Sequence, residues 1–215
     1  MQVNVRLDGE FDGPTNMARD VELLHPSEVQ VRIYDWTAVW VTLGRFQKPD
    51  EVLVPGTPVP YVMRPTGGGG VLHGHDVTVG MSFPNEWLGL KPNSRDVRTA
   101  YLEGIRPLAK ALTASGLPCA LAADLLPKTE GGEKRFGDCF AGISENDVIH
   151  RQKLTKVCGC AVRMYPEAVL FQASIPLREP MIPYREVFQD AGDHVFYPWD
   201  PASLREELEA AIIGA

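Results

Sequence analysis

The sequence predicts an α+β fold in one domain that spans residues 1–215. The chain has 215 residues, which is enough for one domain with a full core, and no change in composition marks a domain boundary. The expected order of elements is a helix, several strands, one long helix, more strands and a closing helix. Because this order leaves few long parallel crossovers, it favours a mixed α+β domain over a doubly wound sheet.

A short helix and four strands are predicted in the first part of the chain. The helix covers residues 16–25 and ends at Pro26. Its apolar residues Met17, Val21 and Leu24 share one face. Runs of β-branched and aromatic residues predict strands at 28–34, 38–43, 59–63 and 77–83, with a glycine-rich loop between the last two.

The clearest helix is expected over residues 96–115. Ser94 is its expected N-cap, and Gly116 marks its end. Apolar residues recur along it at intervals of three and four, which places one face in the core: Val97, Tyr101, Ile105, Leu108 and Leu112.

More strands follow the long helix, and a last helix closes the domain. The strands are expected at 119–122, 138–140, 147–150, 156–162 and 168–175. Residues 128–135 are expected to form a polar turn or loop. The last helix covers about residues 201–213, with Asp200 as its N-cap.

The composition argues against several classes of protein. A formal net charge of −7, without a run of lysine or arginine, argues against general nucleic-acid binding. The first residues carry acids in place of an apolar stretch, so no signal peptide is expected, and no stretch approaches the ~20 apolar residues that span a membrane. Four cysteines are too few for a disulfide scaffold, which indicates reduced thiols and a cytoplasmic protein.

The segment 64–80, RPTGGGGVLHGHDVTVG, is the most informative part of the chain. Its consecutive glycines, from Gly67 to Gly70, are entropically costly, which indicates a sharp bend or a close approach to another group. Their N–H groups can surround a phosphate or a developing oxyanion, and the missing side chains leave room for an alkyl chain. The alternative is a glycine-rich hairpin loop. The pattern matches neither the phosphate-binding loop nor the dinucleotide fingerprint.

Two further segments contain candidate chemical groups. Lys156 begins a small-residue strand, where a cation can meet a carbonyl or phosphate oxygen, and Gly159 and Ala161 allow close approach. The alternative for Lys156 is a solvated lysine at a strand end. Cys139 follows a polar loop and can act as a nucleophile if a nearby lysine lowers the pKa of its thiol. The alternative for Cys139 is a small core residue beside Phe140.

A metal site formed by Cys158, Cys160, His73 and His75 is a further alternative. The Cys-x-Cys spacing within a strand points both side chains to one face, and the sequence has no second pair of this kind. The metal alternative is therefore disfavoured, and no bound metal is expected.

Four segments follow one another in an order that resembles a known family. They are 16–24 (NMARDVELL), 32–52 (RIYDWTAVWVTLGRFQKPDEV), 64–73 (RPTGGGGVLH) and 156–161 (KVCGCA). In this order they resemble the lipoate–protein ligases and octanoyltransferases of the biotin/lipoate A/B protein ligase superfamily, and the resemblance covers residues 16–177. The Arg-Pro-Thr-Gly-Gly loop resembles the lipoate branch more than the biotin ligases.

The resemblance implies a fold and a set of site residues. The implied fold is a central mixed, largely antiparallel β-sheet packed by helices, the class II synthetase-like fold of biotin and lipoate ligases, without an accessory C-terminal domain. An acyl chain then lies in a tunnel under the glycine-rich loop, and Lys156 contacts the acyl carbonyl or an acyl-adenylate phosphate. Asp20 lies in the matching N-terminal helix, with either a structural or a functional role. The implied substrate-binding residues are Arg64, Gly67, Gly68, Gly69, Gly70, His73, Gly159 and Ala161.

Two reactions share this scaffold in the family. An octanoyltransferase takes octanoyl from an acyl carrier protein and passes it through a cysteine thioester to the lysine of a lipoyl domain or a glycine-cleavage H-like protein, without a cofactor. A ligase uses ATP and Mg to make lipoyl-AMP before the transfer to lysine. Cys139-Phe140 matches the Cys-Phe of one octanoyltransferase subgroup, which favours a transferase with Cys139 as nucleophile and Lys156 stabilising its thiolate and the oxyanion. A catalytically idle paralogue that binds a lipoyl or acyl group is the third alternative.

The sequence also departs from the family pattern. Gly69 stands where many octanoyltransferases have Arg and many ligases have Gly, which favours the ligase. Val162 stands where Gln is common, and Val79-Gly80 replaces a frequent Tyr-Ser. Basic residues are further expected to form a positive rim that receives an acidic lipoyl domain: Arg45, Lys48, Arg64, Lys153 and Arg163.

Overall fold

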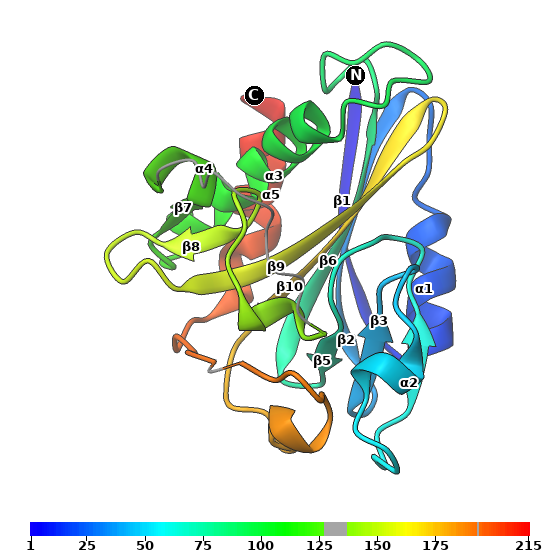
Figure 1. The fold of residues 1–215 in the computed structure, drawn as a ribbon. Helices are drawn as coiled ribbons and strands as arrows, with labels where there is room; N and C mark the ends of the chain where they lie inside the picture. The colour runs from blue at the N-terminus through cyan, green and yellow to red at the C-terminus, as the bar shows by residue number, and fades with distance from the viewer. Residues whose placement is uncertain (127–136, 193) are drawn as a thin grey trace.

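A computed structural model describes residues 1–126, 137–192 and 194–215 (Figure 1). The polar loop expected at 128–135 lies outside the described residues. The α-helices are α1 (Gly13–Val21), α2 (Pro49–Val52), α3 (Val97–Ala114), α4 (Ala122–Leu125) and α5 (Leu204–Ile213). The strands are β1 (Gln2–Phe11), β2 (Glu28–Trp36), β3 (Trp40–Leu43), β4 (Tyr61–Met63), β5 (Val71–His73), β6 (Asp76–Pro84), β7 (Cys119–Leu121), β8 (Val148–His150), β9 (Lys156–Met164) and β10 (Ala168–Pro176). Short 3₁₀ turns are η1 (Cys139–Ala141), η2 (Tyr184–Glu186) and η3 (Pro201–Ser203).

Two β-sheets form the framework of the described chain. The larger sheet has the strand order β1-β2-β6-β10-β9-β8-β7, and the smaller has the order β4-β3-β5. In the larger sheet β1 and β2 run parallel, and each of the other neighbouring pairs is antiparallel. In the smaller sheet β3 runs parallel to β4 and antiparallel to β5. This arrangement confirms the predicted α+β fold with a mixed, largely antiparallel sheet.

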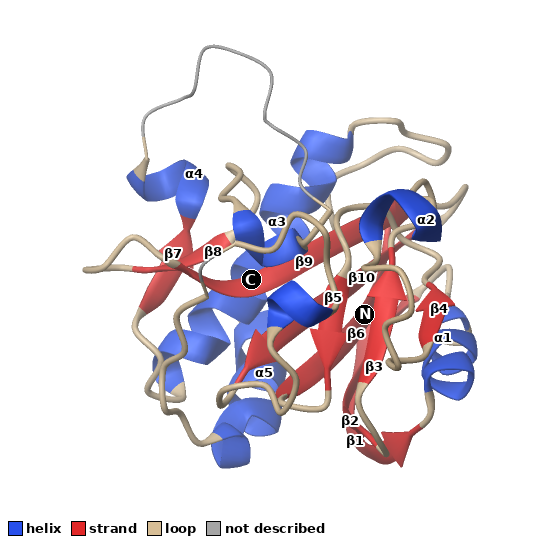
Figure 2. Cartoon of the chain, turned by 60° about the horizontal axis from the view of Figure 1, so that its bottom comes forward, coloured by secondary structure: helices blue, strands red, loops and turns tan. Residues whose placement is uncertain are grey.

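Helices α3 and α5 cover one face of the larger sheet (Figures 1 and 2). The main core between these layers contains Leu108 of α3 and Leu208 of α5 together with strand side chains. Burying one aliphatic side chain of this kind contributes about 1.5–3 kcal/mol. A Cβ at Gly104 of α3 would overlap the ring of Phe171 on β10, so the glycine lets the helix pack close to the sheet. This layer supports β9 and β10, which carry much of the candidate site.

Helix α1 and the smaller sheet lie on the opposite face of the larger sheet (Figure 2). Ile33 and Tyr34 are neighbours on β2, and their side chains point to opposite faces because side chains alternate along a strand. Ile33 enters the main core, whereas Tyr34 packs with Met17 of α1 and with Trp36. The space between α1 and the two sheets is where the candidate site lies.

A buried polar network joins α1 to the larger sheet. The Asp20 carboxylate, which is fully buried, accepts hydrogen bonds from Arg32 Nη1 at 2.8 Å and from the Tyr34 hydroxyl at 2.8 Å. It also accepts one from Gln172 Nε2 at 2.5 Å, and Arg32 Nε donates to Asp8 at 2.7 Å. Burial raises the pKa of Asp20, and the charge of Arg32 opposes that rise. The contacts of Asp20 link α1, β2 and β10, which is a structural role.

The N-terminal elements differ from the prediction in two respects. Strand β1 is absent from the sequence-based reading because it lies at the sheet edge and only Val5 of its residues is buried, which leaves a weak apolar pattern. Helix α1 begins three residues before the expected start, because Asp12 caps it by accepting a hydrogen bond from Thr15 N at 2.9 Å. The helix ends at Val21, four residues before the expected end. The expected bounds of 16–25 are therefore wrong at both ends.

The two long helices are confirmed, with one correction of a cap. The N-cap of α3 is Asp96, not Ser94, because the Asp96 carboxylate accepts the hydrogen bond of Thr99 N at 3.0 Å. Val97 is 46% exposed, so the buried face of α3 begins one turn later than expected. Asp200 caps the closing helix as predicted, although the first turn there is the 3₁₀ turn η3.

Most predicted strands are confirmed to within about two residues at each end. The strand expected at 138–140 is wrong, because these residues form the 3₁₀ turn η1 with one isolated bridge from Gly70 to Asp138. Strand β5 begins within the expected glycine-rich loop and pairs with β3. Both differences place the glycine-rich loop directly beside Cys139.

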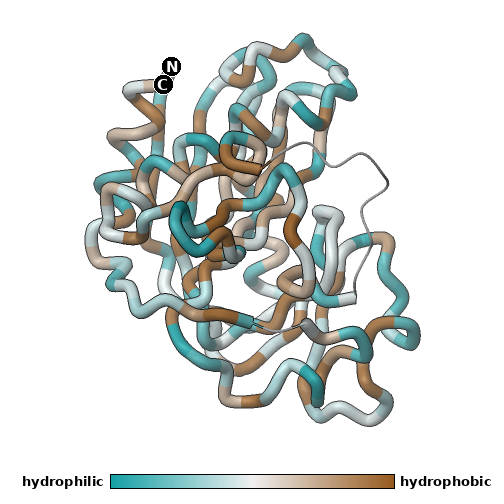
Figure 3. Tube along the Cα trace, turned by 60° about the vertical axis from the view of Figure 1, so that its left-hand side comes forward, coloured by the Kyte–Doolittle hydropathy of each residue, from teal (hydrophilic) through white to brown (hydrophobic). Residues whose placement is uncertain are grey.

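In the part of the chain that the structure describes, no helix is long and apolar enough to cross a membrane. Hydrophilic residues interrupt the hydrophobic ones along the whole coloured trace (Figure 3).

Candidate functional site

A narrow cavity lies between α1, the larger sheet and the smaller sheet. It is partly open to solvent and leaves about 20 Å³ for the centre of a water-sized sphere. The lining combines apolar, small and polar side chains: Met17, Tyr34, Trp36, Thr42, Arg64, Val71, His73, Thr78, Cys139, Gly159, Cys160, Ala161, Gln172, Ala173 and Ser174.

Cys139 reaches this cavity from the turn η1. Asp138 N-caps the turn, since its carboxylate accepts the Phe140 N–H at 2.9 Å. The other oxygen of Asp138 lies 2.6 Å from His194 Nε2, which ties the C-terminal segment to the turn. Cys139 N donates to Gly70 O at 2.8 Å, so the turn is bound to the glycine-rich loop. These contacts hold a half-buried cysteine at the cavity wall.

Lys156 and Asp147 complete a chain of charged groups beside Cys139. Lys156 Nζ lies 3.5 Å from Cys139 Sγ, 2.7 Å from Cys139 O and 2.8 Å from Asp147 Oδ1. The side chains of Lys156 and Asp147 are each only 6% exposed. Ser144 N donates to the second oxygen of Asp147 at 2.7 Å, which holds that carboxylate in place. A buried ammonium group thus faces both the sulfur and the backbone carbonyl of Cys139.

The pKa of the Cys139 thiol differs from the expectation. Burial raises this pKa above its ordinary value, and the positive charge of Lys156 offsets the rise only in part. Burial alone lowers the pKa of Lys156, but the adjacent Cys139 and Asp147 shift it upward overall, so Lys156 remains an ammonium ion at neutral pH. The expectation that a lysine would lower the pKa of Cys139 below its ordinary value is therefore wrong. The lysine is present, but burial has the larger effect.

Arg64 supports the glycine-rich loop from inside the protein. Its buried guanidinium donates to Gly67 O at 2.5 Å and to Gly69 O at 2.6 Å, and also to Thr42 O at 3.1 Å. Gly68, between the two bonded carbonyls, has a positive φ of 84°, a conformation that glycine adopts without strain. Because Arg64 is buried and fully engaged, it cannot belong to the positive rim that the sequence suggested.

The N–H groups of the loop are not equivalent. Gly70 N donates to Gly137 O at 2.6 Å, so this amide is already occupied. Within the described residues, no hydrogen-bond acceptor is found for the N–H groups of Gly67, Gly68 and Gly69. These three amides are the ones available to an anionic group.

Two glycines make room for Cys139. A Cβ at Gly69 would lie 2.8 Å from Cys139 N, and a Cβ at Gly159 would lie 3.2 Å from Cys139 Sγ. An arginine at position 69, as in many octanoyltransferases, is therefore incompatible with this position of the Cys139 backbone. The position of Cys139 in this chain therefore requires a glycine at position 69.

His73 lies in the polar part of the cavity wall. Its ring stacks on Trp36 with centroids 4.0 Å apart, and its two nitrogens lie 2.9 Å from Thr42 Oγ1 and 2.8 Å from Asp76 Oδ2. Burial alone raises the pKa of Asp76, but the contact with His73 and a hydrogen bond from Ser174 reverse that effect and lower the pKa to about 2. Thr42 and Asp76 thus hold the two ring nitrogens of His73, and Trp36 packs against one face of the ring.

The structure offers no support for the metal alternative. Among the residues it describes, no three His, Cys, Asp or Glu side chains come together as a metal ion requires. Cys158 Sγ lies 3.5 Å from Cys160 Sγ inside the core, and His75 Nε2 instead contacts the Tyr184 hydroxyl at 2.8 Å. Burial lowers the pKa of His75 to about 4.

Arg64, His73, Cys139, Gly159 and Ala161 line the cavity, and Lys156 and the glycine-rich loop contact Cys139. Three further polar residues were not among those predicted from the sequence. Asp147 and Asp138 lie in polar segments that look like ordinary turns, and only the fold brings them to Lys156 and His194. Gln172 lies in an apolar strand and bonds Thr66 Oγ1 at 2.6 Å, beside the glycine-rich loop. A glutamine in the middle of a buried strand is a usable signal, since such a group needs a partner.

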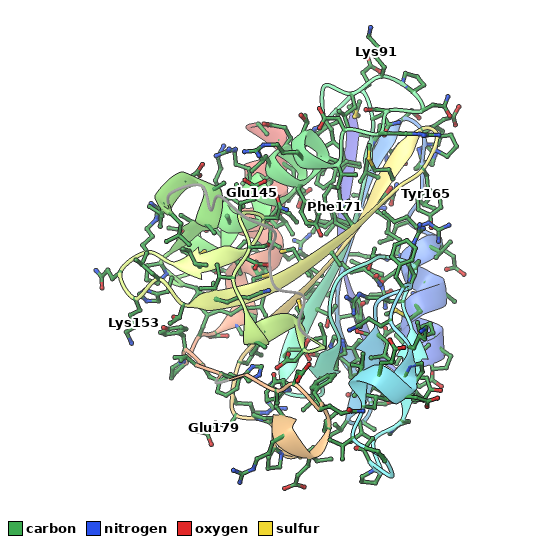
Figure 4. The ribbon with its side chains drawn as sticks, viewed as in Figure 1. Lys91, Glu145, Lys153, Tyr165, Phe171 and Glu179 are labelled. Carbon is green, nitrogen blue, oxygen red and sulfur yellow. The ribbon has the colours of Figure 1, made fainter. Side chains whose placement is uncertain are left out.

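The expected positive rim is not a single surface. Lys153 and Tyr165 lie at opposite ends of β9 (Figure 4). Arg163 is close to the Tyr165 end and Arg45 lines the same groove as Arg163, so Lys153 is remote from both. With Arg64 buried as well, the rim as predicted from sequence is wrong.

Comparisons with known proteins find octanoyltransferases among the relatives of this chain. Octanoyltransferase LipM of Bacillus cereus is 29% identical over 184 residues, which cover 79% of this chain and 63% of that protein. Octanoyltransferase LipM of an Exiguobacterium species is 28% identical over 153 residues, which cover 68% of this chain and 54% of that protein. The chain thus spans between 54% and 63% of the length of these two relatives.

Solved structures share the fold at low sequence identity. A bi-partite lipoate protein ligase with its E2 lipoyl domain, from Thermoplasma acidophilum, has a TM-score of 0.64 and 17% identity, covering 99% of this chain and 80% of that one. A lipoate-protein ligase A bound with ATP has a TM-score of 0.66 and 17% identity, covering 100% of this chain and 83% of that one. The model of the lipoyl protein ligase A/B catalytic domain matches residues 12–203, nearly the whole chain, and this protein therefore belongs to that family.

Proposed function

We propose that this protein transfers an octanoyl or lipoyl group to the lysine of a lipoyl domain through a thioester on Cys139. The observation that carries the proposal is the position of Cys139 Sγ, at the wall of a narrow, largely apolar cavity and 3.5 Å from Lys156 Nζ. A cysteine beside a permanent cation is suited to nucleophilic catalysis, because the cation stabilises the thiolate that attacks. The relatives named as octanoyltransferases support the same reaction.

The first step forms the enzyme thioester. Cys139 releases its proton to solvent, and its sulfur attacks the carbonyl carbon of an octanoyl thioester donor. The new C–S bond forms, the donor C–S bond breaks, and the donor leaves as a thiol after taking up a proton. The N–H of Lys156 that faces sulfur in the resting site can then turn to the carbonyl oxygen, with the free amides of the glycine-rich loop as further donors.

The second step transfers the acyl group to the acceptor. The neutral amine of the target lysine attacks the thioester carbonyl, the C–N bond forms, and the C–S bond to Cys139 breaks. The proton that the amine loses goes to solvent, and Cys139 returns to its resting state. Exchange between thioesters is nearly isoenergetic and amide formation from a thioester is downhill, so no nucleotide is required.

The partners and location are part of the proposal. The donor is an acyl carrier protein, and the acceptor is a lipoyl domain or a glycine-cleavage H-like protein. The structural neighbour solved with its E2 lipoyl domain supports an acceptor of this class. The reaction as written needs no cofactor and takes place in the cytoplasm.

The ligase reaction is the second candidate, and Gly69 is the observation in its favour. Many ligases have glycine at this position, and the structural neighbour bound with ATP shares the fold. In this alternative ATP and Mg would generate lipoyl-AMP, and Lys156 would face its phosphate. Cys139 would then be a wall residue only. A protein that binds an acyl group without catalysis would show neither reaction.

Intact-mass measurement of the whole protein tests the proposal. Incubation with octanoyl-carrier protein, without ATP, is expected to add one octanoyl group, and peptide mapping is expected to locate it on Cys139. Cys119, Cys158 and Cys160 are buried and serve as internal controls. No mass gain, together with lipoyl transfer that requires ATP, would replace the transferase by the ligase. No reaction in either assay would leave only a binding protein.

Replacing Lys156 by glutamine is expected to slow alkylation of Cys139 at a fixed pH. The wild-type thiol already has a raised pKa, and Lys156 is the largest effect that lowers it. Without that charge the pKa of the thiol rises further. The midpoint of iodoacetamide alkylation against pH, followed by peptide mass, should therefore move to higher pH.

The matched control for this experiment is Lys153→Met, which removes an exposed lysine near the start of β9. Its alkylation profile should equal that of the wild type. Glutamine can still donate a hydrogen bond to Asp147, which limits the loss of stability, and the melting temperature of each variant is recorded beside the profile. Equal midpoints in wild type and Lys156→Gln would show that Lys156 does not act on the sulfur.

A further inference from the structure

An arginine-lined groove lies beside the cavity on the outer surface. Its lining includes Arg45, Arg95 and Arg163, together with Gly67 of the glycine-rich loop. Among the residues that the structure describes, the rest of the lining is neutral, and no Asp or Glu contributes to it. The chain as a whole has a formal net charge of −7, so a groove lined only by positive and neutral residues is a marked departure from the average surface. A concave site with one sign of charge attracts ligands of the opposite sign.

The three arginines are free to meet a ligand. No ion pair is found for Arg45, Arg95 or Arg163 among the described residues. Arg163 lies over the Tyr165 ring at 4.7 Å from its centroid, and its Nη1 donates a hydrogen bond to Pro65 O at 3.4 Å. Its other N–H groups have no acceptor among the described residues. Asp96 follows Arg95 directly in the sequence, but its carboxylate accepts hydrogen bonds from Thr99 and does not pair with Arg95. The start of α3 borders the groove as well and contributes a positive helix dipole.

A single strand connects the groove to the reacting sulfur. Gly159, Ala161 and Arg163 alternate with other residues of β9 and therefore point to the same side. Gly159 lies against Cys139 Sγ, and a Cβ at Gly68 would lie 3.8 Å from the Ala161 side chain, so the glycine-rich loop crosses between the two ends. Arg163 lies four residues after Gly159 on this strand, a span of ~13 Å at ~3.3 Å per residue.

We propose that this groove binds the phosphate ester of a pantetheine thioester donor while its acyl carbonyl lies at Cys139. The inference rests on the proposed transferase function and adds the part of the donor that is recognised. A pantetheine arm places a thioester sulfur at one end of an extended chain and a phosphate at the other, which suits a sulfur site and an arginine site on one strand. Arginine is well matched to phosphate because its planar donors form paired hydrogen bonds.

Paired donors with and without phosphate test the inference. The initial rate of Cys139 acylation is measured with octanoyl-pantetheine and with octanoyl-4′-phosphopantetheine, for the wild type and for the double variant Arg95→Gln/Arg163→Gln. The wild type is expected to prefer the phosphorylated donor by about tenfold or more in kcat/KM, as hydrogen bonds to a charged group imply. The double variant is expected to lose this preference and to keep the wild-type rate with octanoyl-pantetheine. Arg98→Gln is the matched control, because Arg98 is exposed on α3 and pairs with Glu145 outside the groove.

Equal losses with both donors, or no loss with the phosphorylated one, would overturn the inference while leaving the transferase function intact. A direct binding measurement separates the two proposals in the other direction. Calorimetric titration of Cys139→Ala with 4′-phosphopantetheine should show binding that the double variant weakens about tenfold. If no donor acylates Cys139 but this binding is seen, the groove inference holds and the transferase proposal fails. Absence of binding overturns the groove inference. Repeating the kinetics with octanoyl-carrier protein and octanoyl-coenzyme A tells which of the two sources of the phosphate is preferred.

Discussion

Replacement of Cys139 by alanine is expected to abolish octanoyl loading of the protein and to lower acyl transfer without ATP by about 10⁴-fold or more. Removing the nucleophile of a covalent mechanism is among the largest single effects in enzyme kinetics, because the groups that remain only bind and orient the substrate. Lys156 and the loop amides would still face the acyl carbonyl, but no atom would form the thioester. The measurement is the intact mass after incubation with octanoyl-carrier protein, beside the rate of octanoyl transfer to a lipoyl domain.

Cys160→Ala is the matched control for this prediction. Cys160 also lines the cavity, but its sulfur lies 3.5 Å from Cys158 Sγ in the core, so its removal should leave loading intact. A mass gain that persists in Cys139→Ala and is lost in Cys160→Ala would show that Cys160, and not Cys139, is the nucleophile. A Cys139→Ala protein that still transfers lipoate when ATP is supplied at the wild-type rate would favour the ligase.

The sequence predicts the fold well where local pattern and burial agree. The α3 helix has a long apolar repeat. Strand β10 is buried on both faces, as are the first six residues of β9, and both strands are rich in small and apolar residues. Strand β1 lacks such a pattern because it is an edge strand with one buried side chain. The turn at Cys139 is misread as a strand, since its conformation depends on Asp138 and His194, which are 56 residues apart in sequence.

The site is predictable only in part, for the same reason. Four consecutive glycines and a lysine before a small-residue strand are visible in the sequence, and the structure brings them together. The sign of the pKa shift at Cys139 is not visible, because it is the balance of burial against a lysine 3.5 Å away. The role of Asp147 cannot be predicted from the sequence either, because it depends on the fold placing this acid 2.8 Å from Lys156.

The polar network around Asp20 bears on the site as well as on stability. Asp20 accepts a hydrogen bond from Gln172, and Gln172 in turn accepts one from Thr66 just before the glycine-rich loop. Gln172 also lines the cavity. The position of the loop is thus coupled through two side chains to a carboxylate on α1.

Replacing Asp20 by alanine is accordingly expected to lower the free energy of unfolding by about 3–5 kcal/mol, the usual cost of removing one partner from a buried ion pair. The loss has this size because Arg32 would keep a buried charge, and Tyr34 and Gln172 would lose the acceptor of their hydrogen bonds. Urea denaturation of each variant gives the free energy of unfolding directly, and an unchanged m-value would show that the two-state comparison is valid.

Glu22→Ala, at the exposed end of the same helix, is the control and should change the free energy of unfolding by no more than about 0.5 kcal/mol. Asp20→Asn retains one acceptor oxygen for these donors, so it should be less damaging than alanine. A loss below about 1 kcal/mol in Asp20→Ala would mean that Asp8 and Asn16, which also bond Arg32, are enough to hold its charge.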